Sequence, residues 1–263
     1  MKKIIAVLFF LFILGGCQSK PVTNKAANPS KNSEKRTLTE VSIGSSASTE
    51  ASSTKQTQEN KNRTIAPGAL IQAVSSNDSA KVTEILKAKT YSIDEVNEKG
   101  ETPLLIAVHD NQIEIAKKLI NAGANVNQQD NIEDSPYLYA GAEGRTEILT
   151  YMLAHSMPDQ SITNRFGGNA LIPAAEKGHL DNVKLLLNDG HTNINHQNDY
   201  GYTALIEAVA LRDGSQVYQN IVAELLKHGA DPNIIDNYGK TAKDYADELG
   251  YTNISKMLQE NQS

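Results

Sequence analysis

One pattern of residues recurs along the last three quarters of the chain, and it limits the fold more than any other feature. Each copy has a short apolar run, a turn and a second amphipathic run, which predicts two helices per copy. Such a unit cannot cover its own apolar face, whereas a stack of units can. The copies start at Gly68, Thr102, Ser135, Asn169, Thr203 and Thr241, which lie 34, 33, 34, 34 and 38 residues apart. The spacing therefore predicts a solenoid of about six helix–turn–helix units.

Each recurrent residue type has a physical role at its position. Thr, Ser or Asn at the start can cap a helix by accepting a backbone N–H, and proline fits the first helical position. Small residues let neighbouring helices approach, and glycine can end a helix in the left-handed conformation. The recurrent alanines are Ala107, Ala140, Ala174, Ala208 and Ala246, and the helix-ending glycines are Gly123, Gly190 and Gly229.

The segments TPLLIAV at Thr102, GANVN (123–127) and GADPN (229–233) resemble ankyrin repeats in both residue type and period. The resemblance covers residues 66–263 and implies an all-α ankyrin-repeat solenoid with short β-hairpin tips. The expected repeats lie near 66–99, 100–132, 133–166, 167–200, 201–238 and 239–263. A single long helical bundle would not reproduce the caps and glycines at fixed spacing.

Three departures from the repeat pattern carry structural expectations. Pro173, in NALIPAA, is expected as the fourth helical residue. There its missing N–H removes only the first backbone hydrogen bond of the helix, so the loss of stability is expected to be less than the roughly 3 kcal/mol of a mid-helix proline. Glu133 replaces a tip glycine, so its hairpin is expected to be distorted. The segment ALRDGSQVYQN (210–220) predicts a longer connection between the two helices of its repeat.

The start of the chain predicts export. Residues 2–3 are lysines, residues 4–14 form an unbroken apolar run, and residues 14–17 read LGGC. The run is about half the roughly 20 residues that a transmembrane helix needs, which predicts a signal peptide over residues 1–16. LGGC resembles the lipobox of bacterial lipoproteins, which implies cleavage before Cys17 and a lipid on its thiol; the alternative is an ordinary signal peptide with a chance cysteine. The lipoprotein reading predicts an anchor on the outer face of the cell membrane, or on the outer membrane in a two-membrane bacterium.

Residues 17–65 are predicted to be a lipidated cysteine followed by a disordered tether. Ser, Thr, Asn and Lys dominate this segment, which has too few large apolar residues to offset the entropy of ordering. Cys17 is the only cysteine, so no intramolecular disulfide is possible. The formal net charge of −6 gives no sign of the basic stripe of a nucleic-acid binder.

No catalytic constellation is recognisable in the sequence. It lacks a P-loop, a GxGxxG turn and a GxSxG elbow, and its acidic residues are scattered. His191 and His196 could begin a metal site, but no cysteine or HExxH partner completes one. We therefore expect a protein that is not an enzyme and that carries no cofactor and no metal.

The repeats imply binding to a protein partner through the hairpin tips and the concave face. The later tips carry aromatic residues, the preferred anchors of binding hot spots. The candidate partner-binding residues are Arg165, Phe166, Tyr200, Tyr202, Tyr238 and Lys240. For Tyr202 and Tyr238 the alternative is simple packing on the neighbouring hairpin.

The functional hypothesis is a monomeric, membrane-anchored, extracytoplasmic scaffold without catalytic activity. An inhibitor or immunity protein that captures a toxin or hydrolase is one specific form of that role. The alternative is an envelope structural adaptor that binds cell wall or a membrane complex. The sequence does not identify the partner.

Overall fold

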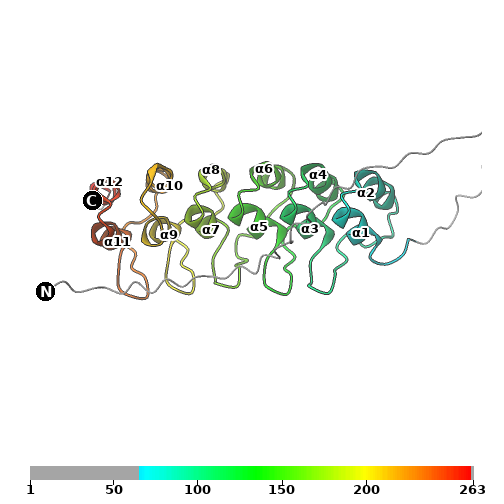
Figure 1. Cartoon of the computed structure of the whole chain (residues 1–263), viewed down its shortest axis with the longest axis horizontal. Helices are drawn as coiled ribbons and strands as arrows, with labels where there is room; N and C mark the ends of the chain where they lie inside the picture. The colour runs from blue at the N-terminus through cyan, green and yellow to red at the C-terminus, as the bar shows by residue number, and fades with distance from the viewer. Residues whose placement is uncertain (1–64, 262–263) are drawn as a thin grey trace, which may run out of the picture. The chain divides into compact units, whose positions relative to one another are not determined.

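Short helices alternate with turns throughout residues 65–261, the part of the chain that the computed structural model describes. The predicted signal peptide, Cys17 and all but the last residue of the predicted tether lie outside these residues. The helices are α1 (Ala69–Ser75), α2 (Ser79–Leu86), α3 (Pro103–His109), α4 (Ile113–Asn121), α5 (Pro136–Ala142), α6 (Thr146–His155), α7 (Leu171–Glu176), α8 (Leu180–Asp189), α9 (Ala204–Ala210), α10 (Gln216–Lys227), α11 (Ala242–Leu249) and α12 (Thr252–Glu260). Figure 1 shows these helices as antiparallel pairs set side by side, with the long connections between pairs all extending to one side.

The pairs stack as the repeat predicted. Each odd-numbered helix packs on the next odd-numbered helix, and each even-numbered helix packs on the next even-numbered one. Within residues 65–261 the fold is all-helical and no strand is recorded, so the predicted hairpin tips are present as hydrogen-bonded turns. The predicted all-α ankyrin-type solenoid of six helix pairs is confirmed.

The caps form at the predicted starts. The Thr102 hydroxyl accepts a hydrogen bond from the Leu105 N–H at 3.1 Å, and Thr203 and Ile206 repeat this contact at 3.2 Å. The first helix lacks such a residue, because it starts after Gly68. The Glu95 carboxylate takes over this role, with Oε2 accepting from the Gly68 N–H at 2.7 Å and Oε1 from the Ile71 N–H at 3.0 Å.

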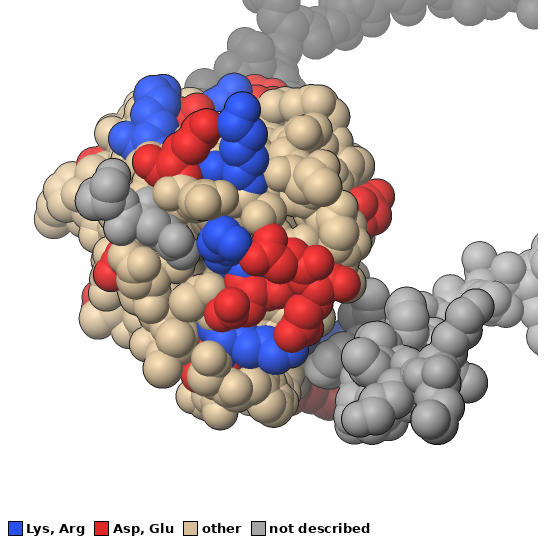
Figure 2. Space-filling view, turned by 90° about the vertical axis from the view of Figure 1, so that its left-hand side faces the viewer, with Lys and Arg blue, Asp and Glu red and all other residues tan. Residues whose placement is uncertain are grey.

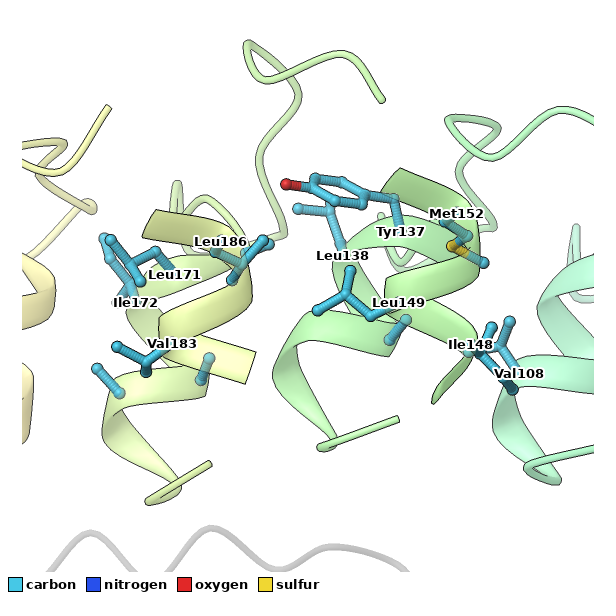
Figure 3. Close-up of a cluster of buried hydrophobic side chains, with 14 of the residues drawn as sticks. Val108, Tyr137, Leu138, Ile148, Leu149, Met152, Leu171, Ile172, Val183 and Leu186 are labelled. Carbon is cyan, nitrogen blue, oxygen red and sulfur yellow. The ribbon is translucent and has the colours of Figure 1, made fainter. Parts of the chain in front are cut away.

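Leucine, isoleucine and valine side chains from both helices of each pair fill the core, and the five recurrent alanines are fully buried between helices. Figure 3 shows this packing around α5 to α8, where Leu149 and Met152 lie near Tyr137 and Leu186 lies near Leu171. The core is continuous from one pair to the next rather than divided into separate clusters. Each pair therefore depends on its neighbours for burial.

Pro173 lies in α7 and delays its start by one residue. In the other capped helices the first ladder bond runs to the capping residue, as from the Ile106 N–H to the Thr102 carbonyl at 3.0 Å. Pro173 has no N–H for the equivalent bond to Asn169, so the ladder begins with the Ala174 N–H and the Ala170 carbonyl at 3.4 Å. The expectation that only the first bond would be lost is met.

The expected distortion at Glu133 is wrong. Glu133 adopts the left-handed conformation itself, with φ of 65°, and Asp130 donates its N–H to the Asp134 carbonyl at 2.9 Å, as in the glycine-containing hairpins. A single non-glycine residue with positive φ costs about 1–2 kcal/mol, which the surrounding hydrogen bonds offset.

The connection predicted over residues 210–220 is longer than in the other repeats, as expected, but it is extended by less than the whole segment. Helix α10 begins at Gln216 and takes up the end of this segment, which leaves residues 211–215 between the helices. The Asp213 carboxylate accepts from the Ser215 N–H at 3.0 Å, and the Tyr251 hydroxyl donates to the Arg212 carbonyl. These contacts bind the connection to its own turn and to the last repeat.

Polar residues cover the C-terminal end of the stack. Figure 2 views this end and shows a patch of acidic side chains with basic side chains above and below it, and a second, smaller acidic group between the upper basic side chains. Ion pairs join Lys243 to Asp247 at 2.6 Å and Lys240 to Glu248 at 2.6 Å. A polar outer face of this kind is what a terminal capping repeat needs for solubility.

Candidate functional site

The connections between helix pairs form five hairpins along one edge of the stack. Each begins with a side chain whose oxygen accepts two backbone N–H groups, two and four residues further on; these residues are Asn97, Asp130, Asn164, Asn198 and Asp236. In the fourth hairpin the Asn198 amide oxygen lies 3.0 Å from the Tyr200 nitrogen and 2.9 Å from the Tyr202 nitrogen. The sequence interpretation missed this anchor. Its signal was an Asn or Asp that recurs five residues before each cap.

Backbone hydrogen bonds join the first hairpin to the second, and the third hairpin to the fourth and fifth, whereas the Arg165 side chain links the third hairpin to the Ile132 carbonyl of the second at 3.4 Å. The Asp199 N–H donates to the Phe166 carbonyl at 3.0 Å, and the Asn237 N–H donates to the Tyr200 carbonyl at 3.2 Å. Gly201 is required here, because a Cβ at this position would lie 2.7 Å from the Asn237 nitrogen. These bonds fix the positions of Phe166, Tyr200 and Tyr238 relative to one another.

We call the third residue of each hairpin the tip row; it consists of Lys99, Ile132, Phe166, Tyr200 and Tyr238. The exposed fractions of Tyr200 and Tyr238 are 46% and 69%, and Ile132 is also exposed. Phe166 is half-buried, with the Arg165 guanidinium 5.0 Å from its ring centroid. Ile132 belongs to this row by the same spacing as the aromatics, but it was absent from the predicted site residues.

Tyr202 behaves differently from Tyr200 and Tyr238. It is half-buried, and its ring lies edge-on to Tyr245 with centroids 6.2 Å apart. Burial raises the pKa of the Tyr202 hydroxyl. The packing alternative considered for Tyr202 and Tyr238 therefore describes Tyr202, whereas Tyr238 remains open to solvent.

The two predicted basic site residues have acidic partners inside the chain. Arg165 lies 3.4 Å from the Asp134 carboxylate, whose pKa is raised because burial outweighs the guanidinium. Lys240 lies 2.6 Å from the Glu248 carboxylate, and its ammonium is 5.0 Å from the Tyr245 ring centroid. Both side chains help to hold the hairpins in place, so their charge is only partly free to meet a partner.

Glu207 lies where α9 meets the fourth hairpin, and its exposed fraction is 5%. Its Oε1 accepts a hydrogen bond from the Asn198 side-chain amide at 3.0 Å, while its Oε2 has no hydrogen-bond partner among the described residues. Burial, with a smaller contribution from the nearby Glu176 carboxylate, raises the pKa of Glu207 to about 8. The signal that was missed is the repeat position itself, which holds Ile106, Tyr139, Pro173 and Tyr245 in the other capped repeats.

The described residues show neither a metal-ligand cluster nor a membrane-spanning helix. Among residues 65–261, no group of three or more His, Cys, Asp or Glu side chains is placed to hold a metal ion. His191 pairs with Asp189 at 3.0 Å, whereas the His196 ring lies 2.6 Å from the Gly167 carbonyl oxygen, so the two histidines have separate partners. Within the same range, none of the helices combines the length and apolar character needed to cross a bilayer.

The chain is similar to proteins built from the same repeat. A family model described as ankyrin repeats (3 copies) matches residues 54–130, 70–164 and 137–236. The Escherichia coli (strain K12) ankyrin repeat protein YahD is 38% identical over 192 residues, which are 73% of this chain and 94% of that protein.

Solved structures give the same result. The crystal structure of EF0377, an ankyrin repeat protein, is 62% identical and matches with a TM-score of 0.74 over 75% of this chain and 99% of that one. An ankyrin repeat domain from Acinetobacter baumannii AYE is 46% identical and matches with a TM-score of 0.71 over 74% and 97% of the two chains. Ankyrin arrays generally serve as protein-binding scaffolds, and the chain belongs to the ankyrin-repeat family.

Proposed function

We propose that this protein is a lipid-anchored, extracytoplasmic binding module that holds a partner protein against its hairpin edge. The tip row supports this proposal most directly. Tyr200 and Tyr238 place two exposed aromatic rings at equivalent positions of neighbouring hairpins. Exposed aromatics of this kind serve as anchors in protein interfaces, where they supply much of the binding energy.

The anchor is part of the same proposal. The LGGC sequence contains the only cysteine, and the polar segment after it would separate the repeats from the membrane. A flexible chain of about 46 residues reaches roughly 35–40 Å on average. An array held at this distance can meet proteins outside the membrane, which fits capture of an exported partner, as an inhibitor or immunity protein would do.

The binding experiment begins with proximity labelling from the anchored, full-length protein, followed by affinity measurements with the labelled partner. Tyr200→Ala combined with Tyr238→Ala should weaken binding by about 30-fold or more, which corresponds to roughly 2 kcal/mol. Met157→Ala is the matched control, because Met157 is 91% exposed but lies outside the tip row. Equal binding by the tyrosine variant and the control would exclude the tip row as the site.

The anchor has its own test. Cys17→Ala should abolish the incorporation of labelled fatty acid and release the protein from the membrane fraction. Cys17→Ser is a second variant of closer size, and it should fail in the same way because a hydroxyl does not replace the thiol. Labelling that persists in both variants would contradict the lipoprotein assignment.

A further inference from the structure

The spacing of the tip row indicates what kind of partner segment could lie along it. Each hairpin contributes two legs that are hydrogen-bonded to each other, as between the Asn198 N–H and the Tyr202 carbonyl at 3.0 Å. The next hairpin is bonded in turn to the Tyr200 carbonyl. Since adjacent legs in such a ladder lie about 4.8 Å apart, equivalent residues of neighbouring hairpins are separated by about 9.5 Å.

A polyproline II helix has a matching period. It turns once every three residues and rises about 3.1 Å per residue, so every third side chain projects from the same side at intervals of about 9.3 Å. Its backbone has no internal hydrogen bonds and is already extended before binding, which lowers the entropy cost of docking. Surfaces lined with aromatic rings are the usual receptors for such segments. Phe166, Tyr200 and Tyr238 supply the rings here.

The charged residues along the hairpins place a second requirement on the partner segment. Three exposed carboxylates, those of Glu98, Glu133 and Asp199, take part in none of the ion pairs formed among residues 65–261. Lys99 is the one exposed tip-row residue of opposite sign. Glu98 and Glu133 lie on the first two hairpins, whereas the rings lie on the last three. Lys99 offsets the charge of Glu98 on the first hairpin, so Glu133 on the second hairpin is the uncompensated carboxylate next to the aromatic part of the edge.

From these observations we infer that the hairpin edge receives an extended polyproline II segment of the partner, with an apolar residue at every third position and a basic cluster at one end. The apolar residues contact Phe166, Tyr200 and Tyr238, and the basic cluster lies beside Glu133, one period of about 9.3 Å before the residue that contacts Phe166. This inference rests on the proposed function, because it specifies the partner of the same surface. A helical partner fits less closely, because its side chains recur on one face at about 5.4 Å per turn and at about 10.8 Å every second turn.

The test uses three fluorescein-labelled peptides and fluorescence anisotropy with the full-length protein. The first is KKPLPPLPPL, in which leucine recurs at every third position. The second, KKLLLPPPPP, has the same composition without the spacing, and the third, EEPLPPLPPL, reverses the charge. The first peptide should bind about tenfold more tightly than either of the others, a difference of about 1.4 kcal/mol.

Variants connect this binding to the tip row. Tyr200→Ala combined with Tyr238→Ala should remove most of the spacing preference, while Tyr200→Phe combined with Tyr238→Phe should keep it, because the rings remain. Glu133→Gln should reduce the preference for the lysine peptide over the glutamate peptide and leave the spacing preference intact, whereas Glu98→Gln, one hairpin further away, is the control and should change neither preference. Both glutamates are exposed, so these substitutions should not affect folding.

Two results would overturn the inference. One is equal or absent binding of KKPLPPLPPL and KKLLLPPPPP. The other is a spacing preference that survives the double alanine variant. Neither result would remove the proposed function, since a partner captured from the cell surface and weakened by the same alanine variant would still bind the tip row through a surface of another shape.

Discussion

The buried positions of the array and its hairpin tips follow different rules. The alanine five residues after each cap is fully buried in all five capped repeats, and leucine or another large apolar residue fills the buried position two after the start in the first five repeats. The tip row instead changes from lysine to isoleucine, phenylalanine and tyrosine along the stack. Burial against an identical neighbour demands the same residue each time, whereas a tip faces solvent and is free to differ. The contrast separates the residues that stabilise the array from those available to a partner.

Removing a large core side chain should give the largest loss of stability. Leu149→Ala deletes a fully buried side chain in the middle of the stack. Comparable substitutions lower the free energy of unfolding by about 2–5 kcal/mol, because they remove apolar burial and leave a cavity. Chemical denaturation followed by circular dichroism measures the effect.

Thr150→Ala is a suitable control for this substitution, since Thr150 is exposed on the same helix. It should change the free energy of unfolding by no more than about 0.5 kcal/mol. A loss at Leu149 no greater than that at Thr150 would contradict the assignment of a tightly packed core.

Glu207 lies between the buried core and the hairpin tips, so its ionisation tests whether the burial of the core extends to the base of the hairpin. Its pKa of about 8 in the folded protein exceeds the ordinary value, so the folded state holds a proton that the unfolded state releases between about pH 4.5 and 8. Stability should therefore fall as the pH rises through this window. Glu207→Gln keeps an acceptor for Asn198 and removes the charge, so it should raise the free energy of unfolding at pH 9 by as much as about 3 kcal/mol.

The control for Glu207→Gln is the same comparison of unfolding free energies at low pH. At pH 4 the carboxyl group is protonated in both states, and the variant and the original chain should then have nearly the same free energy of unfolding. A difference that stays constant from pH 4 to pH 9 would show that burial does not raise the pKa of this group.

The hairpin anchors should have a smaller effect than the core. Asn164→Ala removes the oxygen that accepts from the Phe166 and Gly168 N–H groups, both at 3.0 Å. Because this edge of the hairpin is partly open to water, we expect a loss of about 1–2 kcal/mol in the free energy of unfolding. Thermal unfolding of the variant measures it.

Asn164→Asp provides the matched comparison, since Asp130 and Asp236 perform the same role in other hairpins. It should retain most of the stability that alanine loses. If both variants lose the same amount, the acceptor oxygen is not what holds the hairpin.

Helix caps between residues close in sequence were predictable, although the equally local hairpin anchors were missed, and contacts between residues distant in sequence were not predictable. The Thr102 cap and the place of Pro173 follow from residues no more than four apart, so sequence spacing was enough to predict them. The cap that Glu95 supplies to α1 reaches across more than twenty residues, and the Tyr202–Tyr245 contact spans 43. Glu133 shows another limit, because a residue other than glycine can adopt positive φ when its hydrogen bonds offset the strain.

The number of helix pairs, their order and the positions of their caps could all be predicted from the repeat pattern. These properties depend on a periodic pattern of apolar and capping residues, and each repeat carries that pattern in full. By contrast, it took the stacked repeats to show that Tyr238 faces solvent while Tyr202 packs on Tyr245, and that Lys240 is paired with Glu248. Exposure and pairing of a tip side chain depend on what the adjacent helices and hairpins place beside it, and that placement is fixed only when the repeats stack.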